Sequence, residues 1–413
     1  MTPALDTPVP EAVGFSSQRL ARIKPAMQAY VDSGKFAGIS TLLARRGQIV
    51  HFEQVGARDK TTRAPMSADT IFRVYSMTKP VVCTALMTLY EEGRFHLFEP
   101  VARFLPAFAK VKVWAGDGKP LADPVRPVLI RDLFTHTSGL TYNFLEDTPV
   151  SAMYQDADLG NADRSLQAIV NELARLPLAY QPGTKWHYSM SIDVLGHLIE
   201  VLSGQPLQDF LQTRIFGPLG MTNTGFSVRE SDRSRVAGMY GHPDILLNRF
   251  SGIIQAAAEG RNLPVDVSKT YPTGNTTTFA RGGYGLFSTA TDYFRFAQML
   301  LNRGALSGER VLGPKIVDLM HTNHLPPSLL PFSVGVIPLP GYGFGLGSRV
   351  LLDVAESALP GSAGEFGWAG AATTHYWVDP KEELIGIFMS QFMVCLEPVS
   401  KDFQLLAYQA LIS

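Results

Sequence analysis

The chain is poor in the residues and segments that mark several protein classes. It has only two cysteines in 413 residues, which excludes a framework of disulfides. Cys83 lies in an apolar helical pattern, so we expect it to pack as a small hydrophobe. The longest apolar stretches, such as 80–90, are far shorter than the ~20 residues of a membrane-spanning helix. No membrane span is therefore expected.

A surplus of positive charge is also missing. Lys and Arg total 36 and Asp and Glu total 37, which gives a formal net charge of -1. Proteins that bind nucleic acid concentrate basic residues to neutralise phosphates, so no nucleic acid is expected as a partner. The first fifteen residues have no basic segment followed by an apolar one. We therefore expect no secretory signal and a cytoplasmic location.

What the chain does contain is typical of a folded protein with many loops. Hydrophobic residues make up 46%, and 37 glycines and 28 prolines are spread along the sequence. The length exceeds that of an ordinary domain. We therefore expect either one large domain or two interleaved ones, with ample length to bury a core.

The pattern of apolar residues predicts strands at both ends of the chain and helices between them. Hairpins are predicted at 39–44 with 48–55, across a turn containing Gly47, and at 373–378 with 384–390. Apolar residues at helical spacing predict helices at 16–32, 164–175, 191–203, 206–215 and 402–411. A further helix is predicted within 76–93, where Pro80 suits the first turn and Gly93 suits the C-cap.

This order of elements predicts two domains. Residues 1–97 and 276–413 would form one discontinuous α/β domain, and 98–275 would form an inserted, mostly helical domain. Within the insert, 243–278 lacks strong periodicity, and long loops of this kind often line binding sites. We expect that segment to help shape a substrate pocket.

The first candidate for chemistry is Ser76-Met77-Thr78-Lys79, where an extended segment turns into a helix. Residues three apart on a helix are neighbours, so the Lys79 ammonium can lie beside the Ser76 hydroxyl. A nucleophile and the group that activates it would then share one turn. By itself the motif is also compatible with an ordinary helix cap followed by a solvated lysine.

Further motifs give this serine a context. They are LFTHTSGL at 133–140, PGTKWHYSMSIDVLG at 182–196, IFGPLGMTNTGF at 215–226, GGYGLFSTATDYFRFAQMLL at 282–301 and WAGAATTHYWVDP at 368–380. With SMTK, and in this order, they resemble the serine β-lactamase and penicillin-binding-protein superfamily. Within it the chain is most similar to the class C β-lactamase-like group and its family VIII carboxylesterases. The resemblance implies an α+β fold, with an antiparallel sheet flanked by helices and an inserted, mostly helical domain.

The resemblance also implies roles for three side chains. Ser76 would be the acylated nucleophile, Lys79 its partner, and Tyr188 the general base or a proton relay. A nearby cation favours the ionised form of a tyrosine, and Lys79 is the natural source of that charge. Because such a pair titrates together, the sequence does not decide whether Lys79 or Tyr188 is the formal base.

The third matching element is Trp368-Ala369-Gly370, where β-lactamases and transpeptidases carry Lys-Thr-Gly. Gly370 would let substrate approach the strand closely, and Trp368 would offer an apolar surface suited to an uncharged ester. By the same resemblance, the backbone N–H groups of Ala371 and Ser76 would form the oxyanion hole.

A second departure from the β-lactamases follows Tyr188. Met190 stands where the class C enzymes have asparagine, and a thioether cannot offer an amide to a lactam or peptide bond. Both departures favour esters over β-lactams as substrates. Ser189 and Ser191 are interpreted as helix caps, with a proton relay as the alternative.

Other kinds of site find little support. A Ser-His-Asp hydrolase would need a Gly-x-Ser-x-Gly elbow, and the nearest sequence, Gly361-Ser362-Ala363-Gly364, has a different spacing. The sequence contains no His-Glu-x-x-His motif and no P-loop, so neither a metal nor an organic cofactor is expected.

The sequence thus predicts a serine carboxylesterase that hydrolyses short-chain carboxylic esters, with a small-molecule ester as its partner. An acyltransferase, or a D-amino-acid peptidase or weak β-lactamase of the same superfamily, is the alternative. A non-catalytic binding protein with the same fold is a further alternative. The physiological ester and the oligomeric state are left open by the sequence.

Overall fold

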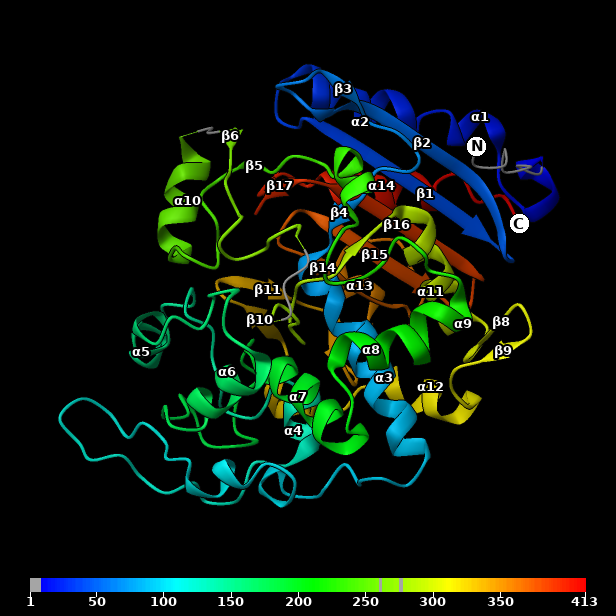
Figure 1. Cartoon of the computed structure of the whole chain (residues 1–413). Helices are drawn as coiled ribbons and strands as arrows, with labels where there is room; N and C mark the ends of the chain where they lie inside the picture. Colours follow the sequence, from blue (N-terminus) through cyan, green and yellow to red (C-terminus); the bar gives the residue numbers. More distant parts are fainter. Residues whose placement is uncertain (1–8, 260–261, 275–277) are drawn as a thin grey trace.

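The largest sheet of the described residues has eight antiparallel strands and lies in the upper part of the view in Figure 1. The computed structural model describes residues 9–259, 262–274 and 278–413. The strand order is β12-β13-β14-β15-β16-β1-β2-β3, so strands from the two ends of the chain meet where β16 pairs with β1. The strands are β1 (Gly38–Arg45), β2 (Gln48–Asp59), β3 (Ala64–Pro65), β12 (Tyr342–Phe344), β13 (Arg349–Leu351), β14 (Phe366–Gly370), β15 (Thr374–Asp379) and β16 (Leu384–Ser390).

Both predicted hairpins are confirmed. Arg46 and Gly47, with φ of 51° and 76°, connect β1 to β2. Two positive φ values in a two-residue loop give a turn whose twist matches that of the strands. Between β15 and β16, the Asp379 carboxylate accepts the backbone N–H groups of Lys381 and Glu382 at 3.0 and 3.2 Å, which fixes the turn.

Helices pack on both faces of the sheet. Leu43 and Phe388 share a hydrophobic cluster with Phe403 of α14. The neighbouring strand residues Leu42 and Ile387 belong to the other cluster, which contains α3 and α11. Successive side chains of a strand point to opposite faces, so the two clusters are the two sides of the sheet.

The helices are α1 (Ser17–Leu20), α2 (Ile23–Asp32), α3 (Thr78–Glu91), α4 (Ile130–Phe134), α5 (Val150–Asp156), α6 (Leu166–Leu173), α7 (Ser191–Ser203), α8 (Leu207–Leu211), α9 (Gly217–Leu219), α10 (Phe250–Ala258), α11 (Ala290–Leu301), α12 (Pro314–Met320), α13 (Val354–Ser357) and α14 (Val399–Tyr408). A π-helical turn, Gln212–Phe216, joins α8 to α9. Short 3-10 turns lie at Pro10–Val13, Tyr75–Met77, Val101–Arg103, Pro106–Lys110, Glu230–Arg235 and Pro327–Leu329.

The predicted first helix is wrong in one respect, because it is two helices. Ser16 caps α1 as expected, its hydroxyl accepting the Arg19 N–H at 3.3 Å, but the helix ends at Leu20 and α2 begins at Ile23. Pro25 explains the interruption. It has no N–H to donate to the carbonyl four residues earlier, and its ring would clash with that carbonyl.

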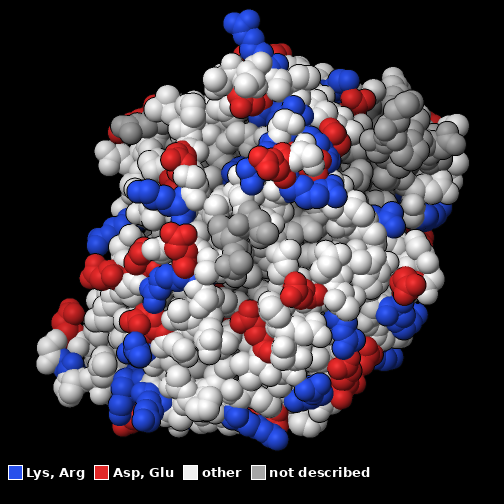
Figure 2. All heavy atoms as spheres, viewed as in Figure 1, with Lys and Arg blue, Asp and Glu red and all other residues white. Residues whose placement is uncertain are grey.

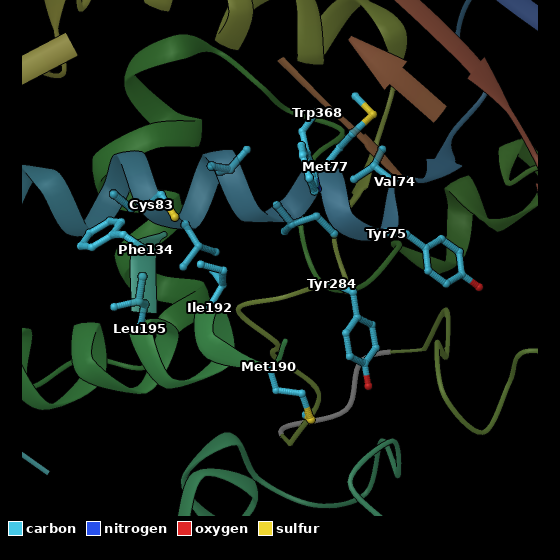
Figure 3. Close-up of a cluster of buried hydrophobic side chains, with 14 of the residues drawn as sticks. Val74, Tyr75, Met77, Cys83, Phe134, Met190, Ile192, Leu195, Tyr284 and Trp368 are labelled. Carbon is cyan, nitrogen blue, oxygen red and sulfur yellow. The ribbon is translucent and has the colours of Figure 1, made fainter. Parts of the chain in front are cut away.

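The helices between α4 and α8 pack against the large sheet through α3. The larger cluster runs from Leu42 in the sheet through Val81 of α3 to Ile192 of α7. Figure 3 shows side chains of α4, α7 and β14 gathered around α3. The predicted boundary at 275/276 lies outside the described residues, and the division into two domains stays a prediction.

The segment 243–278 contains a helix that its sequence pattern did not reveal. α10 packs beside the 142–146 stretch, where the Phe250 N–H donates to the Phe144 carbonyl at 3.0 Å. Short strand pairs complete the fold: β4 (Phe72–Arg73), β5 (Tyr240–Gly241), β6 (Leu263–Pro264), β7 (Phe287–Ser288), β8 (Ala305–Leu306), β9 (Glu309–Arg310), β10 (Phe332–Val334), β11 (Ile337–Leu339) and β17 (Phe392–Met393).

Two further properties concern the surface and the helices. On the face shown in Figure 2, positive and negative side chains are interspersed.

Among the described residues, no helix has both the length and the apolar character needed to cross a membrane.

Candidate active site

Ser76 lies in the 3-10 turn Tyr75–Met77, directly before α3. Tyr75 has a φ of 42°, which side-chain-bearing residues seldom adopt, and its ring lies 4.8 Å from that of Tyr271. Strained backbone of this kind persists where the surroundings enforce it. Aromatic packing around Tyr75 thus presents the serine at the start of the helix, where the helix dipole favours negative charge.

Strand β14 lies directly against this turn. A Cβ atom on Gly370 would be 2.3 Å from the carbonyl oxygen of Val74, so only glycine allows the approach. The Thr374 hydroxyl also donates to that carbonyl, at 3.4 Å. The side-chain position of Gly370 therefore faces the segment that carries Ser76, a use of this glycine that the sequence did not indicate.

Lys79 is almost fully buried, with 1% of its surface exposed, and all three of its N–H groups have acceptors. Its Nζ donates to Ser76 Oγ at 3.0 Å, to Tyr142 Oη at 2.9 Å and to the Gly283 carbonyl at 2.7 Å. The structure thus brings the two motif residues into direct contact. An exposed, solvated lysine is excluded.

Tyr188, on the loop before α7, completes the group. Its hydroxyl donates to Ser76 Oγ at 2.6 Å, and Lys79 Nζ lies 4.6 Å from the centre of its ring. The expected contact of Lys79 with Tyr188 is therefore made to the ring face, because the N–H groups of the lysine are used elsewhere. A cation over an aromatic face is still attracted to it.

Trp368 of β14 offers a hydrogen-bond donor in addition to the apolar surface that the sequence predicted. It is buried, and its indole N–H donates to the Tyr188 hydroxyl oxygen at 3.4 Å. The ring centres of the two residues are 5.7 Å apart. A donor aimed at the tyrosine oxygen stabilises that oxygen when it carries negative charge. Trp368 can therefore support Tyr188 chemically as well as sterically.

Tyr142 is a site residue that the sequence reasoning missed. It follows the 133–140 motif by two positions, which was the available signal, but its contact with Lys79 joins residues far apart in the chain. Burial raises the pKa of the Tyr142 hydroxyl well above its usual value, with Tyr188 and Asp193 adding to the effect. Tyr142 therefore stays protonated and serves as a neutral partner of Lys79.

A chain of buried hydroxyls lies behind the tyrosines. Ser189 Oγ is 3.2 Å from Nδ1 of His136 and 2.7 Å from Ser191 Oγ, which in turn is 2.7 Å from Ser138 Oγ. Burial lowers the pKa of His136 well below its usual value, so the imidazole is neutral. These serines bond one another instead of capping α7, and the ring of His136 packs 4.9 Å from that of Tyr188.

Aromatic side chains form one wall of the site. Phe332 at the start of β10 packs on Trp186, with ring centres 4.4 Å apart, and Phe344 of β12 packs on Trp368 at 5.2 Å. Trp186 stacks on Tyr188 at 6.1 Å. This wall is apolar, and Met190, which is buried and drawn in Figure 3, adds no amide or charge to the site.

The structure also places Ala371, the second residue of the expected oxyanion hole. Ala371 directly follows β14, and its carbonyl accepts the Val394 N–H at 2.7 Å. The oxyanion hole formed by the N–H groups of Ala371 and Ser76 stays a prediction. Among the residues that the structure describes, no cluster of three or more His, Cys, Asp or Glu could hold a metal ion.

Comparisons with known proteins agree with this geometry. A sequence model of the family described as Beta-lactamase matches residues 23–411. The chain is 38% identical over 369 residues to Protein Rv1367c of Mycobacterium tuberculosis, covering 87% of each chain. It is 31% identical over 380 residues to Esterase EstB of Burkholderia gladioli, covering 90% of each.

Among solved structures, the fold is similar to EstCE1, described as a hydrolase with promiscuous acyltransferase activity. The TM-score is 0.76 at 26% identity, covering 96% of this chain and 99% of the other. The chain belongs to the beta-lactamase family, and the predicted β-lactamase/transpeptidase-like α+β fold is confirmed. The chain is a serine hydrolase of this family, and the catalytic roles of Ser76, Lys79 and Tyr188 stay predictions.

Proposed function

We propose that this protein is a carboxylesterase that hydrolyses short-chain carboxylic esters through an acyl-enzyme on Ser76. The observation that carries the proposal is the pair of hydrogen bonds to Ser76 Oγ, from Tyr188 at 2.6 Å and from Lys79 at 3.0 Å. A serine hydroxyl becomes a good nucleophile only when a neighbouring group removes its proton.

Tyr188 enters the first step as the phenolate, with its hydrogen bond to Ser76 reversed so that the serine hydroxyl donates. Ser76 Oγ then attacks the ester carbonyl and its proton passes to Tyr188. Lys79 stabilises the negative charge that the tyrosine needs as a base, and the indole N–H of Trp368 assists at the same oxygen. The carbonyl oxygen becomes negative and is held by the backbone N–H groups of Ser76 and Ala371. Tyr188 then returns the proton to the departing alcohol.

In the second step, a water molecule attacks the acyl-enzyme. Tyr188 accepts a proton from that water and passes it back to Ser76 Oγ as the acid leaves. The same residues therefore act in both halves of the reaction, first with the alcohol and then with water.

The chemistry of the site favours an uncharged ester. The wall of Trp186, Phe332, Phe344 and Trp368 is apolar, and Trp368 replaces the lysine that would bind the carboxylate of a β-lactam or peptide. Met190 cannot hydrogen-bond an amide. The similarity to an esterase at 31% identity supports the same substrate class.

The test is the initial rate of p-nitrophenyl butyrate hydrolysis by the wild type, Ser76→Ala and Ser362→Ala. Ser362 is a control because it is buried and lies in the sequence nearest to an alternative nucleophile motif. The wild type and Ser362→Ala should turn over the ester, and Ser76→Ala should lose at least ~10³-fold in kcat. Equal rates in all three proteins would contradict the proposal.

Acyl transfer is a second candidate, supported by the printed description of EstCE1 as a hydrolase with promiscuous acyltransferase activity. An acyl-enzyme in an apolar site can be attacked by an alcohol instead of water. Adding a primary alcohol to the assay decides between the two. A transferred ester that exceeds the free acid at low alcohol concentration would make transfer the main reaction. Nitrocefin and a D-alanyl dipeptide in parallel assays test the lactamase and peptidase alternatives.

A further inference from the structure

Asp193 is a buried carboxylate beside the site that the mechanism above does not use. It is the third residue of α7 and has no exposed surface. Its Oδ1 accepts the backbone N–H of Gly283 at 3.1 Å, while Oδ2 is buried without a hydrogen-bond partner among the described residues. An unpartnered buried carboxylate oxygen is costly, so its retention calls for a physical reason.

Gly282 and Gly283 lie flush against the start of α7. A Cβ atom on Gly282 would be 1.9 Å from the carbonyl oxygen of Ile192. A Cβ atom on Gly283 would be 2.5 Å from Asp193 Oδ2 and 2.7 Å from Tyr142 Oη. The free oxygen of Asp193 and the hydroxyl that binds Lys79 therefore border the same small space. Only glycine fits there.

Gly283 connects Asp193 to Lys79. Its N–H is held by Asp193 Oδ1, and its carbonyl accepts Lys79 Nζ at 2.7 Å. The three acceptors of Lys79, which are Ser76 Oγ, Tyr142 Oη and this carbonyl, are all neutral. A buried ammonium needs an opposite charge nearby. Burial raises the pKa of Asp193, while the Gly283 N–H and the charges of Lys79 and Arg281 act in the opposite direction, so the carboxylate interacts with both cations.

We propose that Asp193 is a positioning residue for Lys79, fixing the Gly283 carbonyl that holds the ammonium and supplying the negative charge that balances it. This inference rests on the proposed function, since it assigns Asp193 to the machinery of Ser76.

Replacing Asp193 by asparagine separates charge from shape, because the amide oxygen can still accept the Gly283 N–H. Removing a negative charge makes neighbouring groups lose their protons at lower pH. Both limbs of the pH–rate profile of p-nitrophenyl butyrate hydrolysis should therefore move to lower pH, by about one unit. A purely structural role would lower the rate and leave both limbs in place.

Asp292 provides a matched control. It is also the third residue of its helix, α11, is also buried, and accepts the Asn223 backbone N–H at 2.7 Å and the Thr224 hydroxyl at 3.0 Å. Asp292→Asn removes the same charge at the same helix position without touching Lys79. Its pH profile should match that of the wild type.

A second measurement does not need turnover. With 13C-labelled lysine, and Lys79→Met to assign the signal, the titration midpoint of Lys79 should fall by about one pH unit in Asp193→Asn and stay constant in Asp292→Asn. An unchanged midpoint and profile in Asp193→Asn, or equal shifts in both variants, would overturn the proposal. Absence of Ser76-dependent turnover in the wild type would instead overturn the proposed function, and the titration would still decide the role of Asp193.

Discussion

Two of the clusters of titratable and polar side chains in the described part of the chain differ in one respect, because only one of them includes a partly exposed nucleophile. The site cluster consists of Ser76, Lys79, Tyr142, Tyr188 and Asp193. The α14 cluster consists of Arg349, Glu365, Asp379, Gln404 and Tyr408, where α14 packs on the sheet. Gln404 Nε2 donates to Glu365 at 3.0 Å, and the Tyr408 hydroxyl lies 3.0 Å from Glu365 and 2.8 Å from Asp379.

The two clusters contain similar side chains, but their hydrogen bonds connect different parts of the molecule. In the α14 cluster, the side chains bond a helix to strands, and burial raises the pKa of Glu365 to about 7. In the site cluster, the hydrogen bonds converge on the hydroxyl of Ser76, which is partly exposed and follows a strained tyrosine. A perturbed pKa in a buried cluster therefore does not by itself identify an active site. An accessible nucleophile with its activating groups does.

The largest expected difference between the clusters is in catalysis. Tyr188→Phe keeps the ring over Lys79 but removes the hydroxyl bonded to Ser76, and should lower kcat for p-nitrophenyl butyrate by ~10²–10⁴-fold. The midpoint of urea unfolding should change little, because the ring packing remains. A variant that keeps the wild-type kcat would show that Tyr188 transfers no proton.

The α14 cluster should control the pH dependence of stability. Folded Glu365 keeps its proton up to about pH 7, whereas the unfolded side chain loses it near its usual pKa of 4.5. Folded protein therefore binds more protons in this window, and the contribution of Glu365 to stability falls as the pH rises from 4.5 to 7, by on the order of 3 kcal/mol.

Glu365→Gln removes this titration. Relative to the wild type, the variant should gain stability as the pH rises across that window, as measured by urea unfolding at pH 5 and pH 8. Comparing the two proteins cancels the buried histidines, such as His51, whose pKa burial lowers to about 4. A difference in unfolding free energy that is the same at both pH values would show that Glu365 is ionised throughout.

Tyr408→Phe sharpens the contrast with Tyr188→Phe, because each removes one buried hydroxyl. Without its hydroxyl, Tyr408 no longer bonds Glu365 and Asp379, which should cost about 1–3 kcal/mol of unfolding free energy. The variant should keep kcat within about twofold, as measured with p-nitrophenyl butyrate at a temperature where it stays folded. A large loss of kcat in the folded variant would show that the clusters are coupled.

Trp368→Phe is expected to have the smallest effect. The substitution removes the indole N–H that reaches the Tyr188 oxygen at 3.4 Å and keeps an aromatic side chain at the site. A long hydrogen bond to a developing charge corresponds to about a tenfold fall in kcat. Loss of affinity with kcat unchanged, as seen in separate measurements of KM and kcat, would show that the tryptophan only contacts substrate.

Local patterns in the sequence predicted most of the fold. The turn at Arg46 and Gly47 and the α7 boundaries at Ser191 and Ser203 follow from nearby residues, and the structure confirms them. The break before α2 was also encoded, by Pro25, but helical spacing of the apolar residues concealed it. The helix α10 was missed although Phe250, Ile253 and Ile254 lie at helical spacing, because this short run stands inside a long segment that was interpreted as a loop.

The site was only partly accessible to sequence reasoning. Ser76 and Lys79 share one helical turn, so their contact could be predicted from spacing alone. The contact of Lys79 with Tyr142 spans 63 positions and that with Gly283 spans 204, and no local rule predicts either. Asp193 stood in a recognised motif, but its function depends on a carbonyl supplied by another part of the chain.

The central claim is that Ser76 forms an acyl-enzyme with the ester. Wild-type protein should be mixed with p-nitrophenyl butyrate, quenched in acid during the first turnovers, digested and examined by mass spectrometry, with Ser76→Ala treated in parallel. The account predicts a butyryl group on the peptide containing Ser76 and none in the variant. A butyryl group on another residue, or undiminished hydrolysis by Ser76→Ala, would contradict it.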